Sequence, residues 1–204
     1  MVAIVLAKNN PIARDHDIDS TDLRAAFQRI NTEMRRANEA KIREITKDSA
    51  DRQLWDGPFS QLANSKVTSR FAEHRSYFVA GDKNSEAIHF GYDLASTATA
   101  PITAANAGRV VYADDLGIYG GCVLIDHGLG LATLYGHLSR IDAKVGDEVA
   151  KGETLGRSGS TGLAGGDHLH FAVLLGDTYV DPLEWWDREW VRTHIEMRIE
   201  PSRG

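Results

Sequence analysis

The chain has 204 residues, 42% hydrophobic and 25% charged, a balance that excludes collagen-like, mucin-like and wholly disordered proteins. Its 23 basic and 29 acidic residues give a formal net charge of −6, so composition offers no basic surface for a nucleic-acid partner. Its one cysteine, Cys122, excludes an internal disulfide framework.

A short apolar run opens the chain at residues 2–7 and is followed by Lys8-Asn9-Asn10-Pro11. Six apolar residues are too few to cross a bilayer, which takes about 20. The run also has neither the basic leader nor the long apolar region of a secretory signal. We expect a β-strand here, the remnant of a larger protein, and the compartment of the chain does not follow from this end.

Residues 19–48 have the pattern of a helix. Asp19-Ser20-Thr21 offers side-chain oxygens for an N-cap. Apolar residues then recur at steps of four, three and four, which places them on one helical face: Leu23, Phe27, Ile30 and Met34. We predict an amphipathic helix that packs on its neighbours, with a helical linker or the end of a coiled coil as the alternative.

Glycine-rich turns and short β-branched runs dominate after Trp55-Asp56-Gly57-Pro58. We predict strands at residues 109–113, 122–126, 131–135, 168–175 and 178–180. The turn at residues 128–130 should join the second and third of these as a hairpin. Asp181 should cap a C-terminal helix that has Pro182 at its first position. Many short strands with close turns indicate an antiparallel β domain.

The predicted fold class is therefore mainly β. An antiparallel sheet or sandwich forms the core, with an N-terminal helical arm and a short C-terminal helix. We divide the chain into the arm at residues 1–60, the β domain at residues 61–191 and a C-terminal tail at residues 192–204.

Four of the eight histidines lie in short motifs that suit metal binding or acid–base chemistry. His89 and Asp93 are four residues apart and would share one face of an extended strand, as would His168 and His170. His137 directly follows a predicted strand. A catalytic zinc takes about three protein ligands and keeps one position open. His89, Asp93 and one member of the His168/His170 pair supply that set, and the two remaining histidines suit acid–base chemistry.

Several motifs in the segment 69–187 occur in an order that resembles the lysostaphin/LytM-type zinc metallopeptidases. The similar stretches are His89–Asp93, Gly121–Gly128, Leu134–Ser139, Gly166–Phe171 and Val180–Pro182. Two positions depart from the family pattern: Asp167 stands where many members carry proline, and Ala72 stands where glycine is usual. Neither departure falls on a ligand, but both could reshape the substrate groove.

The resemblance implies a LytM-type metallopeptidase domain at residues 61–191 with one Zn²⁺ per chain. It implies His89, Asp93 and His170 as the metal ligands. It implies His137 and His168 as the catalytic pair that flanks a zinc-bound water. It assigns no residue to substrate binding.

The resemblance also implies the function: a zinc metalloendopeptidase that hydrolyses the peptide cross-links of bacterial peptidoglycan. We expect D-Ala–diaminopimelate bonds rather than polyglycine, because no glycine-binding wall-targeting module is visible and the arm looks like part of a larger envelope protein. Peptidoglycan peptide stems would be the partner and the cell envelope, periplasmic or extracellular, the location. A membrane anchor or partner domain outside this chain is left open.

Three other functions compete with this one. A non-catalytic or autoinhibited module that regulates other wall hydrolases would require a blocked cleft, for example by the helix near residues 20–48. A lipoyl-type carrier would explain the hairpin-like stretch 143–156, but Lys144 and Lys151 lack the context of a modified lysine. A non-haem iron oxygenase would use two histidines and a carboxylate and would leave the other two histidines unexplained.

Overall fold

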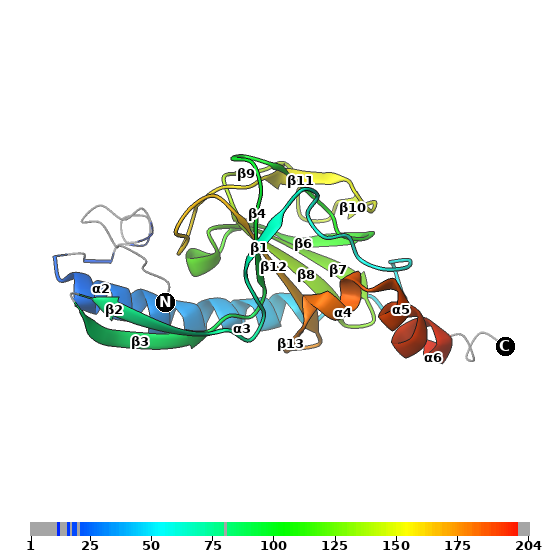
Figure 1. Ribbon diagram of the computed structural model, residues 1–204. Helices are drawn as coiled ribbons and strands as arrows, with labels where there is room; N and C mark the ends of the chain where they lie inside the picture. Colours follow the sequence, from blue (N-terminus) through cyan, green and yellow to red (C-terminus); the bar gives the residue numbers. More distant parts are fainter. Residues whose placement is uncertain (1–11, 13–15, 17, 20, 80, 200–204) are drawn as a thin grey trace.

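An antiparallel sheet of eight strands carries most of the fold in the computed structural model, which describes residues 12, 16, 18–19, 21–79 and 81–199 (Figure 1). The strands lie in the order β1 (Lys66–Ser69), β4 (Tyr92–Ala95), β12 (Leu169–Leu175), β8 (Leu131–Leu138), β7 (Gly121–Gly128), β6 (Gly108–Asp115) and β10 (Glu148–Val149), and β13 (Thr178–Val180) pairs with β12. The predicted hairpin is formed by β7 and β8. The mainly β antiparallel fold class is confirmed.

Two small sheets flank the large one. The first has the order β5 (Pro101–Thr103), β11 (Thr154–Arg157) and β9 (Arg140–Ile141), and the second pairs β2 (His74–Val79) with β3 (Asp82–Ile88). In Figure 1 the first lies above the large sheet, and the second lies below it beside the N-terminal helices.

The N-terminal arm is helical, as predicted. It consists of α2 (Leu23–Arg29), a π-helical turn η1 (Ile30–Met34) and α3 (Arg35–Thr46). The helix begins later than expected, because the N-cap is Asp22, whose carboxylate accepts the backbone N–H groups of residues 24 and 25.

The C-terminal helix is broken into short pieces. Asp181 caps α4 (Pro182–Trp186), with proline in the first turn as predicted. Asp187 is extended, with φ −83° and ψ 113°, and caps a second helix, α5 (Arg188–Val191). The chain continues through a π-turn η3 (Arg192–Glu196) into α6 (Met197–Ile199). The aspartate at position 187 therefore ends one helix and starts the next.

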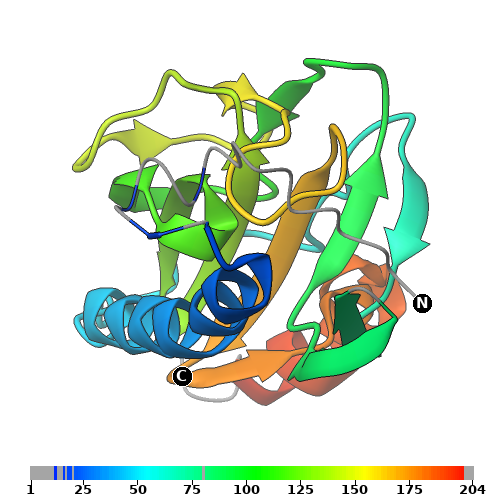
Figure 2. The ribbon, with the colours of Figure 1, turned by 90° about the vertical axis from the view of Figure 1, so that its left-hand side faces the viewer.

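Both faces of the central sheet are buried. Side chains of β7 alternate between two hydrophobic clusters: Val123 and Ile125 belong to one, Cys122 and Leu124 to the other. The first cluster packs against Trp55, Phe59 and Trp185. The second packs against apolar side chains of the arm: Phe27, Ile30 and Ile42. The helical arm thus covers one face of the sheet, as Figure 2 shows from the side.

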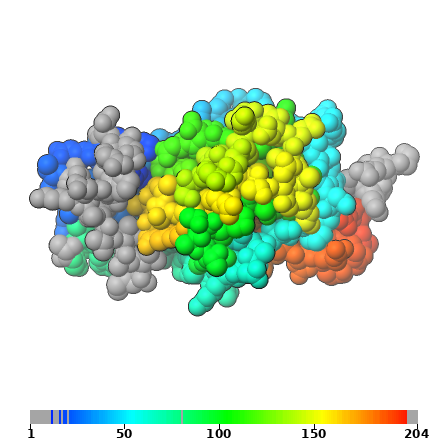
Figure 3. Space-filling model, turned by 90° about the horizontal axis from the view of Figure 1, so that it is seen from above, coloured from blue at the N-terminus to red at the C-terminus, as the bar shows by residue number. Residues whose placement is uncertain are grey.

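The predicted strand at residues 2–7 lies outside the described residues, and the other predicted strands are present, with ends shifted by up to three residues. One 3₁₀ turn, η2 (Gly117–Tyr119), precedes β7. Within the described residues, none of the helices has the length and apolar character needed to cross a membrane. Seen from above, the segment around residues 140–170 spreads over the upper face, between the arm and the C-terminal helices (Figure 3).

Candidate metal centre and active site

The three predicted metal ligands meet at one point below the upper loops. Nε2 of His89 lies 3.0 Å from Oδ1 of Asp93 and 3.0 Å from Nδ1 of His170. The Nδ1 atom of His170 is also 3.0 Å from Oδ1 of Asp93. All three side chains are buried, so two nitrogen atoms and one carboxylate oxygen form a closed triangle.

This triangle fits a zinc ion. Tetrahedral zinc with bonds of about 2.0–2.1 Å holds its ligand atoms roughly 3.3 Å apart. The side chains would need to spread by only a few tenths of an ångström to reach that geometry. Two imidazoles and one carboxylate are also a ligand set of catalytic zinc sites.

His89 and Asp93 do not share one extended strand, and the prediction on this point was wrong. Strand β3 ends at Ile88 and β4 begins at Tyr92, so His89 lies in the connection between them. Its ring is oriented instead by a hydrogen bond from Nδ1 to the carbonyl oxygen of Arg70, at 2.8 Å. That bond leaves the lone pair of Nε2 directed at the triangle.

His170 reaches the triangle from the middle of the sheet. It lies on β12 directly opposite Asp93 of β4. Gly91 makes this approach possible, because a Cβ atom there would lie 2.8 Å from Cε1 of the His170 ring and 2.4 Å from the carbonyl oxygen of Phe171. The glycine therefore leaves room for the third ligand.

Arg75 holds the second oxygen of Asp93 and was not found by sequence reasoning. Its Nη2 donates to Oδ2 of Asp93 at 2.7 Å and to Oγ of Ser69 at 2.6 Å. Because Oδ2 is occupied, only Oδ1 faces the two histidines. The arginine thus presents Asp93 as a ligand through one oxygen.

The remaining two histidines of the motifs lie beside the triangle. The ring centroids of His137 and His168 are 4.7 Å apart, and Nε2 of His168 is 3.6 Å from Oδ1 of Asp93. In each ring, Nδ1 donates to a backbone carbonyl, that of Thr161 at 2.8 Å for His137 and that of Gly166 at 2.7 Å for His168. In each ring, Nε2 is therefore the nitrogen that is not bonded to the backbone.

His137 has a strained backbone. Its φ is +65°, in the left-handed region that few residues other than glycine adopt. The pairing of β7 with β8 shifts register between Gly121 and Val123, so one extra residue bulges from β8 beside His137. Bulges of this kind re-aim side chains near active sites. The strained position is consistent with a functional constraint on this histidine.

The glycine-rich loop after β11 supports both of these histidines, because it contains both accepting carbonyls. Thr161 anchors the loop: its Oγ1 donates to the carbonyl oxygen of Leu138 at 2.9 Å and accepts the N–H of Gly121 at 3.0 Å. Gly162 has φ +68°, and a Cβ there would lie 2.4 Å from the backbone nitrogen of Gly120. The glycines let this loop pack directly onto the strands that carry the site.

Residues 87–182 match the family model described as Peptidase family M23. This segment includes the three predicted metal ligands and the two histidines beside them. The chain contains an M23 peptidase domain. Among curated relatives, the DD-carboxypeptidase/endopeptidase Mpg of Neisseria meningitidis serogroup B is 36% identical over 96 residues, or 47% of this chain and 22% of Mpg. The peptidoglycan DD-endopeptidase ShyB of Vibrio cholerae is 32% identical over 122 residues, or 60% of this chain and 28% of ShyB. The chain thus spans less than a third of the length of these two relatives.

Solved structures share the fold of the M23 domain. A Pseudomonas aeruginosa protein assigned to peptidase M23 aligns with a TM-score of 0.63 and 29% identity over 76% of this chain and 62% of its own. A zinc containing peptidase from Vibrio cholerae aligns with a TM-score of 0.54 and 31% identity over 65% of this chain and 40% of its own. The catalytic domain of lysostaphin from Staphylococcus simulans aligns with a TM-score of 0.53 and 28% identity over 64% of this chain and 98% of its own.

The histidines of the M23 domain differ in their electrostatic surroundings. Burial lowers the pKa of His170 to about 4, and burial beside His168 and His170 holds the pKa of His137 well below its usual range. For His168, burial is outweighed by the nearby Asp93 carboxylate, which raises the pKa of the ring. Burial also opposes the ionisation of Asp93, but contacts with three histidines outweigh it and keep the pKa of Asp93 far below normal.

The two departures from the family pattern have structural roles. Asp167 accepts hydrogen bonds from Oγ of Ser158 at 2.6 Å and from the backbone nitrogen of Thr99 at 2.9 Å, so it ties the loop before His168 to a neighbouring turn. Ala72 has φ +60°, which explains why glycine suits this position. Its N–H donates to the carbonyl oxygen of His89 at 2.8 Å, so the strained residue also supports a predicted ligand.

Proposed function

We propose that the protein is a zinc-dependent metalloendopeptidase that hydrolyses peptide cross-links of bacterial peptidoglycan in the cell envelope. The observation that carries the proposal is the triangle of His89, Asp93 and His170 with two further histidines, His137 and His168, oriented beside it. The relatives named as peptidoglycan DD-endopeptidases support the substrate class. Within this substrate class we propose D-Ala–diaminopimelate bonds rather than polyglycine.

In this proposal His89, Asp93 and His170 hold one zinc ion. When bound, zinc supplies Lewis acidity, which lowers the pKa of water to about 7 and polarises a carbonyl group. The chain orients two of the three ligands before any ion binds. The carbonyl oxygen of Arg70 orients His89, and the guanidinium of Arg75 orients Asp93. The buried position of the triangle strengthens every charge interaction in it.

His137 and His168 would move protons and stabilise charge. Their Nε2 atoms are the nitrogens that are not bonded to the backbone, because each Nδ1 is committed to a backbone carbonyl. Peptide hydrolysis builds negative charge on the carbonyl oxygen, which an imidazole N–H can stabilise, and it releases an amine that must receive a proton. Two histidines whose rings are both held by carbonyl groups of one loop suit those two tasks.

The test compares two substrates with the zinc-loaded protein. A cross-linked muropeptide dimer and a pentaglycine peptide are digested side by side, and the fragments are identified by mass. Cleavage of the dimer at the D-Ala–diaminopimelate bond, abolished by a chelator and restored by zinc, is the expected result. Zinc-dependent cutting of pentaglycine alone would refute the bond assignment, and inertness toward both would favour the regulatory module instead.

A further inference from the structure

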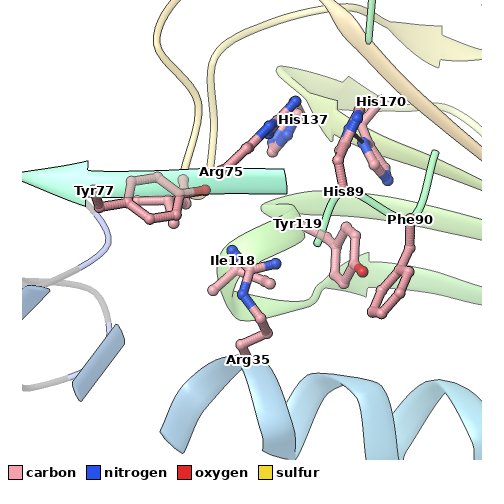
Figure 4. Close-up of a pocket in the computed structure, with 10 residues that line it drawn as sticks. Arg35, Arg75, Tyr77, His89, Phe90, Ile118, Tyr119, His137 and His170 are labelled. Atoms are coloured by element: carbon pink, nitrogen blue, oxygen red, sulfur yellow. Dashed lines mark hydrogen bonds between the residues drawn. The ribbon is translucent and has the colours of Figure 1, made fainter. Parts of the chain in front are cut away.

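A small cavity lies beside the metal triangle and is walled in part by the helical arm. His89, His137, His170, Arg35 and Arg75 are among the residues that line it. Figure 4 shows Arg35 rising from the arm toward this cavity, while Arg75 reaches it from β2. The volume of about 30 Å³ takes about two water-sized groups, at roughly 10–15 Å³ each, and not a whole side chain.

The lining of the cavity is cationic. Ten residues line it, and none of the ten is an aspartate or glutamate. The charge of Arg75 is matched by Asp93, 2.7 Å away. Arg35 has no ion-pair partner among the residues that the structure describes. The buried carboxylate of Glu39 lies behind this lining: its Oε1 accepts a hydrogen bond from the hydroxyl of Tyr119 at 2.6 Å, so Arg35 has a carboxylate one helical turn away without a direct ion pair to it.

Arg35 is fixed in place without losing its charge. Both its Nε and its Nη2 donate to Oδ1 of Asn31, at 3.2 and 2.8 Å. Asn31 is itself 2% exposed and donates from Nδ2 to Oγ of Ser85 at 2.8 Å. A neutral amide thus orients the guanidinium in advance, which lowers the entropy lost on binding an anion.

The backbone before Arg35 is also unusual. The π-helical turn Ile30–Met34 ends directly at this residue. Such turns cost regular helix hydrogen bonding and occur frequently at functional sites. The arm therefore departs from an ordinary helix just where it turns an arginine toward the metal triangle.

We propose that Arg35 binds a substrate carboxylate carried by the carbon next to the scissile nitrogen. The inference rests on the proposed function and deepens it by naming a specificity-determining residue. In a D-Ala–diaminopimelate cross-link that carbon bears a free carboxylate, and the terminal residue of a D-Ala–D-Ala stem carries the same group. In polyglycine the position continues as a neutral amide.

The carboxylate fits the cavity in size and charge. Its two oxygen atoms match the available volume, and a guanidinium binds carboxylates through a planar pair of donors. A charge-assisted hydrogen bond of this kind contributes about 10- to 100-fold in affinity. Arg35 would therefore separate free-carboxylate substrates from amidated or polyglycine substrates.

The kinetic test uses the zinc-loaded enzyme with a muropeptide dimer and a D-Ala–D-Ala pentapeptide stem, each with the relevant carboxylate free or amidated. In whichever substrate is cut, kcat/KM should favour the free form by about 10- to 100-fold. Arg35→Gln should remove most of this preference and Arg35→Lys should retain part of it. Arg36→Gln, an exposed neighbour on the arm, is the matched control and should behave as wild type. Equal preference in wild type and Arg35→Gln would overturn the inference.

A binding test separates this inference from the proposed function. The metal-free protein is titrated with L-Ala–γ-D-Glu–meso-diaminopimelate and with the same tripeptide amidated at the carboxylate under test. Wild type and Arg36→Gln should bind the free form more tightly, and Arg35→Gln should lose that difference. If no peptidoglycan is cut but this pattern holds, the proposed activity fails and the carboxylate site stands. If cross-links are cut and the pattern is absent, the proposed activity stands and the carboxylate site at Arg35 fails.

Discussion

Replacing His127 should change how the stability of the fold depends on pH. This side chain is 0% exposed in the first hydrophobic cluster, where its ring lies edge-on to Phe59. Nδ1 donates to the carbonyl oxygen of Ala107 at 2.7 Å, and Nε2 accepts from the hydroxyl of Thr133 at 2.8 Å. These two bonds use the neutral ring, and burial lowers the pKa of His127 from 6.5 to about 4.

The sign and size of this pH dependence follow from the difference in proton binding between the folded and the unfolded chain. Between pH 6.5 and about 4 the unfolded chain takes up a proton at this position and the folded chain does not, so the free energy of unfolding falls as pH falls through that window. A pKa difference between 6.5 and about 4 corresponds to about 3 kcal/mol. His127→Gln should lose packing at every pH, but it should not show this part of the pH dependence.

The assay is urea unfolding of metal-free protein at intervals from pH 4 to pH 8. The difference in unfolding free energy between wild type and His127→Gln should shrink by about 3 kcal/mol toward the acid end. Leu134→Ala, a fully buried change without a titratable group, is the control and should give a difference independent of pH. A pH-independent difference for His127→Gln would refute the reasoning.

Three further predictions concern the site. Asp93→Ala should remove most bound zinc and abolish hydrolysis, and metal analysis that finds stoichiometric zinc with unchanged affinity would exclude Asp93 as a ligand. His137→Ala and His168→Ala should each retain zinc but lose about 10²–10⁴-fold in kcat, the usual contribution of an acid–base group; near-normal turnover in either would remove that histidine from the mechanism. Ala72→Gly should raise the free energy of unfolding by up to about 1 kcal/mol, because it relieves a left-handed alanine, and a decrease in urea unfolding would contradict the strain.

Local sequence patterns predicted the central strands well. Strands β7 and β8 are apolar runs bounded by glycine turns, and their hairpin follows from the short distance between them. The place of the helical arm was not predictable in the same way. Its apolar stripe indicated that Phe27 and Ile30 would be buried, but nothing local indicates which face of the sheet they cover.

The spacing of histidines and a carboxylate indicated His89, Asp93 and one member of the His168/His170 pair as ligands, and only the resemblance to the LytM-type family singled out His170. The reason offered for His89 and Asp93 was nevertheless wrong, since β3 ends at Ile88 and β4 begins at Tyr92, so the two residues do not share a strand. Arg75 was missed because it lies 18 residues from Asp93 and belongs to no ligand motif. Arg35 was missed because its approach to the site depends on how the arm packs.

The position of the arm limits how such an enzyme could be switched on. Phe27, Ile30 and Ile42 pack in the second hydrophobic cluster against leucines of the sheet that are 0% exposed: Leu124, Leu134 and Leu174. Proteolytic release of residues 1–60 would leave these leucines facing water, and each loses about 1.5–3 kcal/mol when its burial is lost. A trimmed domain should therefore aggregate rather than become active. Any control exerted through the arm must act by small shifts of a helix that stays attached.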